Sequence, residues 1–249
     1  AADCTYTIAE ILSATGRHTE AAERFATCIE VFRAQGPEFV HQPLLGMALL
    51  HSRRGDLSAT AEWIARCRAH AEPLGLQWTL ANCANLEGEV ARATGNLDVA
   101  VPRYREAVDR YRVLESPNFT FPLLNLAIVD TSLGRYDTAL QRLRPLRVHL
   151  GWQPDAVLGA FSEMVAMVAH AGREEFDEAA ASLERLTLHV GQSGLVDADI
   201  AVMAERAGVL FRRAGRADDA RRALLLAEGQ YRLVSRVEEA DGVRALAFE

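Results

Sequence analysis

The sequence contains no lysine: all 27 of its basic residues are arginine. This absence excludes a phosphate-binding loop of the G-x-x-x-x-G-K-[ST] type, which requires a lysine. Acidic residues outnumber basic ones by 34 to 27, which gives a formal net charge of −7. Because binding to nucleic acid needs clustered positive charge, we expect no direct nucleic-acid contact by this segment.

Cysteine is also scarce: the four residues are Cys4, Cys28, Cys67 and Cys83, and none forms a C-x-x-C pair. A chain of 249 residues can bury a core without disulfides, so we expect reduced thiols and a cytoplasmic location. There is no signal-peptide n-region and no apolar run long enough to span a bilayer, so we expect no membrane partner. The chain begins with Ala1 rather than methionine, and we expect it to be part of a longer protein.

Sequence motifs for catalysis and metal binding are missing as well. None of the seven histidines falls in H-E-x-x-H or pairs with a cysteine at ligand spacing, no serine lies in G-x-S-x-G, and G-x-G-x-x-G does not occur. We therefore predict no catalytic residues, no metal site and no cofactor, and a protein that is not an enzyme.

The sequence does contain six copies of one short signature, in which a glycine is followed several residues later by a small residue. Aligned on that small residue, the series is Ala21, Thr60, Ala100, Ala139, Ala179 and Ala220, with steps of 39, 40, 39, 40 and 41 residues. In five units the glycine lies five residues earlier. In the fifth, Gly172 lies seven residues before Ala179, which we interpret as a two-residue insertion. Self-similarity at such a period is typical of stacked repeat proteins.

The flanks of the signature repeat too. Seven residues before the glycine comes a small residue in five units, namely Ala9, Ala48, Gly88, Ala127 and Gly208, and Val165 is the exception. Four residues after the aligned small residue comes a large one: Phe25, Ile64, Tyr104, Leu143, Leu183 and Leu224. Each unit is therefore predicted to be two helices joined by a turn, whose glycine ends the first helix with a positive φ. Since one helix pair cannot bury both faces, the units must stack.

This reading predicts an all-α chain that forms one domain over 1–249, with six units and a final helix. The units cover about 1–36, 37–75, 76–116, 117–153, 154–194 and 195–234, and 235–249 is a capping helix or a truncated repeat. The first helices are expected near 2–14, 39–53, 78–93, 120–132, 155–170 and 196–213. The second helices are expected near 18–34, 57–72, 97–114, 136–150, 176–190 and 217–233, before a last helix near 235–248.

The segments "PLLNLAIVDTSLGRYDTALQRL" (122–143) and "ANLEGEVARATGNLDVAVPRYREAV" (84–108) resemble the tetratricopeptide repeat family. The period near 40 is longer than the usual 34 of that family, and it is similar to the units in sensor regions of large bacterial transcription activators. The resemblance implies a right-handed superhelical solenoid. HEAT repeats, whose period also matches, are the alternative architecture.

In the tetratricopeptide family the first helices line a concave groove that binds ligands. Carried over by position, this implies groove residues Asn82, Asn85, Glu89, Arg92, Phe121, Leu124, Asn125, Ile128, Ser162 and Glu205. Asn125 lies nine residues before Gly134, where the family often has a groove asparagine. A side-chain amide can both donate to and accept from a peptide backbone, and Arg92 could pair with a carboxylate.

We therefore predict a non-catalytic module that binds a protein or peptide, as the sensor or interaction region of a multi-domain bacterial transcriptional regulator. Two alternatives stay open at this point. One is an oligomerisation scaffold that forms a homodimer through apolar end helices. The other is a domain that binds a small effector.

Overall fold

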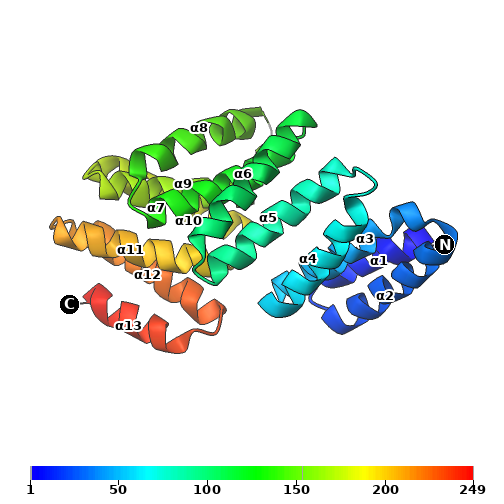
Figure 1. The fold of residues 1–249 in the computed structure, drawn as a ribbon. Coiled ribbons are helices and arrows are strands. Elements are labelled where there is room, and N and C mark those ends of the chain that lie inside the picture. The colour runs from blue at the N-terminus through cyan, green and yellow to red at the C-terminus, as the bar shows by residue number, and fades with distance from the viewer. Residues whose placement is uncertain (1, 153, 249) are drawn as a thin grey trace. The chain divides into compact units, whose positions relative to one another are not determined.

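The computed structural model describes residues 2–152 and 154–248, and within them it contains thirteen α-helices, two short 3-10 helices and no strand (Figure 1). The chain divides into two compact units, residues 1–122 and 123–249, each of which is described by itself. Among the described residues, no helix is both long enough and apolar enough to cross a membrane.

The first unit holds three helix hairpins. Its elements are α1 (Ala2–Ala14), α2 (His18–Gln35), η1 (Pro37–Phe39), α3 (His41–Arg53), α4 (Leu57–Ala71), α5 (Gln77–Ala93), α6 (Leu97–Val113) and η2 (Pro117–Phe119). Each α-helix packs against the next one along the chain, and α3 also contacts α5. Contact between the first helices of successive repeats is what stacking requires.

The second unit continues the same pattern. Its helices are α7 (Thr120–Ser132), which begins just before the boundary, α8 (Tyr136–Trp152), α9 (Ala156–Gly172), α10 (Phe176–Ser193), α11 (Ala198–Arg213), α12 (Ala217–Leu233) and α13 (Val237–Phe248). Here α9 packs against α8, α10 and α11, and α12 lies between α11 and α13. Every helix expected from the sequence is present, with ends that differ by three residues or fewer.

The turns between paired helices confirm the predicted role of glycine. Gly16, Gly55, Gly95, Gly134 and Gly215 all have φ between 71° and 81°, the left-handed region that favours glycine. At Gly134, its N–H donates to the Thr131 carbonyl at 3.1 Å, and the next N–H donates to the Asp130 carbonyl at 2.8 Å. These bonds satisfy carbonyls that the end of α7 would otherwise leave without partners.

The fifth turn corrects the sequence interpretation. The left-handed residue there is Glu174, with φ of 64°, and Gly172 is the last residue of α9. The N–H of Glu174 donates to the Ala171 carbonyl at 3.1 Å, as in the glycine turns. Glu174 lies five residues before Ala179, so there is no two-residue insertion. Gly172 has a different role, because a Cβ there would overlap the ring of Tyr136.

The small and large positions of the repeat meet as expected. A Cβ built on Gly88 would lie 2.6 Å from two ring carbons of Tyr104, and one on Gly208 would lie 2.6 Å from Cγ of Leu224. Tyr104 is fully buried, and its ring fills the space that Gly88 leaves between α5 and α6. The paired helices can therefore approach closely because Gly88 and Gly208 have no side chain.

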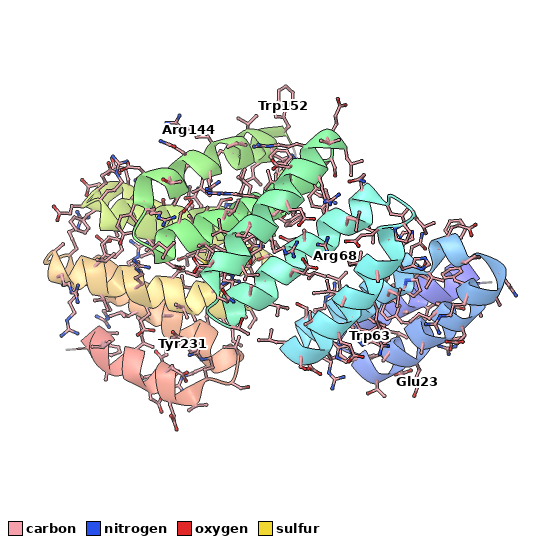
Figure 2. The ribbon with its side chains drawn as sticks, viewed as in Figure 1. Glu23, Trp63, Arg68, Arg144, Trp152 and Tyr231 are labelled. Carbon is pink, nitrogen blue, oxygen red and sulfur yellow. The ribbon has the colours of Figure 1, made fainter. Side chains whose placement is uncertain are left out.

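Charged side chains also join helices in the first unit, where Arg68 on α4 lies at the centre of a network (Figure 2). Its Nε lies 2.7 Å from Oε1 of Glu87 on α5, and its Nη1 lies 3.3 Å from Oε1 of Glu106 on α6. Burial tends to raise the pKa of Glu106, but Arg103, Arg68 and Arg110 together outweigh it and hold that pKa below its usual value. The network thus links two successive repeats.

Candidate ligand-binding face

In the first unit, the predicted groove residues form a row along α5. Asn82, Asn85, Glu89 and Arg92 are spaced by three, four and three residues, which places them on one face of the helix, and all four are partly exposed. The opposite face, which includes Leu80, is buried. The helix therefore presents a continuous polar row above an apolar base.

The row is held in place by its own hydrogen bonds. The side-chain amide of Asn85 donates to Oε1 of Glu89 at 2.8 Å, and that of Asn82 donates to the Trp78 carbonyl at 2.9 Å. Asn82 also contacts the Tyr111 hydroxyl on α6. Burial raises the pKa of Tyr111, and this hydrogen bond opposes the increase. Fixed side chains lose less conformational entropy when a ligand binds.

On α7 the predicted residues divide by burial. Phe121 is 51% exposed and Asn125 is partly exposed, whereas Leu124 and Ile128 are only 5% and 3% exposed. Leu124 and Ile128 therefore belong to the core in this structure, and they do not offer open surface to a ligand. The sequence "TFPLLNLAIVDTS" is apolar nearly all round, so its pattern could not separate a groove side from a core side.

In the second unit, the two remaining predicted residues lie on different helices. Ser162 on α9 is 2% exposed, and its Oγ has no hydrogen-bond partner within the described part of the chain. Glu205 on α11 accepts a hydrogen bond of 2.7 Å from the hydroxyl of Tyr231 on α12 (Figure 2). Burial, followed by this bond, raises the pKa of Tyr231.

The sequence prediction missed one polar residue of the second unit, Arg206 on α11. Its Nη2 donates to the Tyr136 hydroxyl at 3.1 Å, and its guanidinium carbon lies 5.9 Å from the centre of that ring. A signal for Arg206 was present, because it lies nine residues before Gly215, as Asn125 lies nine before Gly134. Arg206 thus occupies the repeat position that Asn125 has in α7.

The described residues contain no group of three histidine, cysteine, aspartate or glutamate side chains that could hold a metal ion. The candidate face is instead built from amides, carboxylates and guanidinium groups. These groups recognise ligands by hydrogen bonds and charge.

Several solved structures share this fold. The apo form of RapI superposes with a TM-score of 0.71 at 12% identity, over 94% of this chain and 84% of RapI. NprR in complex with its cognate peptide NprX gives 0.66 at 15%, over 98% of this chain and 72% of NprR. A tetratricopeptide repeat protein from Parabacteroides merdae gives 0.57 at 12%, over 96% of this chain and 88% of its own length.

No protein-family model matches this chain, and no curated protein matches it either. Together with the helix hairpins and turns described above, the structural matches show that the chain has a tetratricopeptide-like helical-repeat fold.

Proposed function

We propose that this protein is a regulatory module that binds a peptide or a segment of a partner protein on the polar faces of its first helices. The observation that carries the proposal is the row Asn82, Asn85, Glu89 and Arg92 on α5, which is partly exposed and fixed by hydrogen bonds. The complex of NprR with its cognate peptide NprX shows that a protein of this fold binds a peptide, which supports the proposal.

The residues on these faces suit a peptide main chain. Side-chain amides both donate and accept, so Asn82 and Asn85 on α5 could pair with main-chain N–H and carbonyl groups of a peptide of any sequence. Arg92 in the same row could add charged hydrogen bonds to a carboxylate of the peptide, and Glu89 could attract a basic residue. The hydrogen bonds to the peptide main chain would thus hold a peptide of any sequence, and the charges on its side chains would decide which peptides bind most tightly.

We also propose that the module serves as the sensor or interaction region of a multi-domain bacterial transcriptional regulator. The period near 40 supports this context, because it is similar to that of the units in sensor regions of large bacterial transcription activators. Determining the full length of the gene tests it directly, since a DNA-binding domain or a nucleotide-binding domain on the same chain is expected. A gene that encodes this repeat domain alone would contradict the proposal.

The binding proposal is tested with a library of random heptapeptides, from which the best binder is labelled and titrated by fluorescence anisotropy. We expect the double variant Asn85→Ala/Arg92→Ala to weaken binding by roughly thirtyfold or more, because it removes one neutral and one charged hydrogen-bonding group from the α5 row. Arg144→Ala, on the exposed side of α8 (Figure 2), is the matched control and should bind as the parent does.

Thermal melting of each variant shows whether it remains folded. Full binding by a folded double variant would refute the assignment of the face, and so would failure of the library to yield any peptide. One alternative also has an observation in its favour: Ile8 and Ile11 are exposed on α1, where a second copy could pack. Light scattering distinguishes this scaffold role, since a strictly monomeric chain would exclude it.

A further inference from the structure

The first unit contains a pocket that is separate from the α5 row. It has a volume of about 410 Å³ and is lined by Arg33, Pro37, Val40, Leu44, Arg66 and His70. These residues come from α2, from α4, and from the segment that leads through η1 into α3. Sites for small molecules commonly have volumes of about 300–1,000 Å³.

Two walls of the pocket bear positive charge. Arg33 on α2 forms an ion pair with Glu30 at 2.8 Å, and Arg66 on α4 forms one with Glu62. Both partners lie on the same helix as the arginine, and all four side chains are more than half exposed. Exposed pairs of this kind contribute little stability, so an incoming anion can replace either glutamate at small cost.

The other walls are apolar. Pro37 is exposed, whereas Val40 and Leu44 are each only 4% exposed and line the base of the pocket with little open surface. Arg66 also makes a cation–π contact with Trp63, which is labelled in Figure 2: its guanidinium carbon lies 4.6 Å from the centre of the Trp63 ring. A guanidinium packed on an aromatic face is held in a defined orientation and keeps its N–H groups for a ligand.

His70 supplies an independent indication of a ligand. Its Nε2 is buried and has no hydrogen-bond partner within the part of the chain that the structure describes. The neighbouring His41 is satisfied, because its Nδ1 lies 2.8 Å from Oγ1 of Thr79. Burial, and then the charge of His70, lower the pKa of His41. A buried polar atom without a partner is costly, so a turn of the His70 ring toward an anion in the pocket that it lines would relieve that cost.

We propose that this pocket binds a small organic carboxylate with a compact apolar body. The carboxylate pairs with Arg33 and Arg66, the His70 ring turns so that its Nε2 can donate to the carboxylate, and the apolar body covers Pro37. A guanidinium matches a carboxylate with two parallel hydrogen bonds. Inorganic phosphate would satisfy the charges but leave the apolar wall uncovered, and a neutral ligand would do the reverse.

The test is a titration of the full chain with 2-naphthoate, followed by calorimetry or ligand-detected NMR. We expect saturable binding at one site in the millimolar range or tighter, and binding at least tenfold weaker for 2-naphthamide and for inorganic phosphate. Arg66→Gln and Arg33→Gln should each weaken 2-naphthoate by roughly tenfold, because each removes a charged hydrogen bond. Arg24→Gln, an exposed arginine on α2 outside the pocket, should leave binding unchanged.

Four outcomes would overturn the proposal. Equal affinity for 2-naphthamide would reduce the pocket to an apolar surface, and equal affinity for phosphate would reduce it to a general anion site. Undiminished binding by a folded Arg33→Gln/Arg66→Gln double variant, or no saturable binding at all, would show that the pocket does not take this ligand. None of these outcomes bears on peptide binding by the α5 row, because that row contributes no residue to the pocket.

Discussion

Glu174 is the one residue other than glycine at the turns that join paired helices within the six repeats, and replacing it with glycine tests the geometry of those turns. Its φ is 64°, whereas the glycines at the equivalent positions have φ of 71° to 81°. A residue with a Cβ is less stable by about 1–2 kcal/mol in this conformation. Glycine offsets part of that gain by about 0.4–1 kcal/mol, because it makes the unfolded chain more flexible. We expect Glu174→Gly to stabilise the protein by about 0.5–1 kcal/mol.

The surroundings of Glu174 leave little else to change. Its side chain is exposed, and it makes no ion pair or side-chain hydrogen bond to any residue that the structure describes. Its backbone N–H donates to the Ala171 carbonyl at 3.1 Å, and a glycine keeps that bond. The reverse substitution, Gly134→Glu at φ of 72°, should lower the free energy of unfolding by a similar amount.

Urea denaturation followed by circular dichroism measures the free energy of unfolding of both variants. In a thermal melt of a chain of this length, a change of 1 kcal/mol moves Tm by about 2–4 °C. Glu178→Gly is the matched control, since it makes the same substitution at an exposed position in α10. It should destabilise the protein by about 1 kcal/mol, because glycine is a poor helix former. If Glu174→Gly destabilised the protein as Glu178→Gly does, the left-handed conformation would not be a source of strain.

Two further predictions concern the packing and charges of the first unit. Gly88→Ala should lower the free energy of unfolding, measured in urea, by about 1–2 kcal/mol. The new Cβ would lie 2.6 Å from the buried Tyr104 ring, and the cost of this overlap exceeds the gain in helix propensity. An unchanged free energy of unfolding would show that the ring can shift. Arg68→Gln should cost about 1–2 kcal/mol at pH 7, because it removes the more buried of the two guanidinium groups, those of Arg68 and Arg103, that pair with both Glu87 and Glu106. Since the folded pKa of Glu106 is lowered, its contribution is full above the unfolded value of 4.5 and is lost as the pH falls through the folded pKa. Stability curves for the parent and for Arg68→Gln should therefore converge as the pH falls from 7 to 3, and parallel curves would contradict the assignment.

The sequence predicted the helices well because several local signals agreed in every unit. The turn residue, the small residue seven positions earlier and the large residue after the turn are all set by the geometry of one helix hairpin. Pairs such as Gly88 with Tyr104 therefore appear in the sequence as fixed offsets. An expectation that rested on three linked positions was hard to misplace by more than a few residues.

The prediction failed where it relied on residue type instead of spacing. Residue type predicts Gly172 as the fifth turn residue, but the five-residue separation from Ala179 indicates Glu174, which is the residue with a positive φ. The separation is a geometric requirement of the turn, whereas glycine is only the residue that meets it most easily. Gly172 is required for a reason invisible along the chain, the ring of Tyr136 from the preceding hairpin.

In the candidate face too, position in the repeat does not predict which residues are exposed. The position nine residues before each turn residue is an example. That position is polar and partly exposed in the second unit at Asn125 and Arg206, yet it is buried at Leu86 and Val165. Exposure at one repeat position therefore depends on the neighbouring side chains, which differ between units. Repetition fixes where a helix lies, but selectivity for a ligand has to come from the residues that do not repeat. Arg206 is an example, because it has a guanidinium where the equivalent position in α7 has the amide of Asn125, and this guanidinium donates to the Tyr136 hydroxyl on α8.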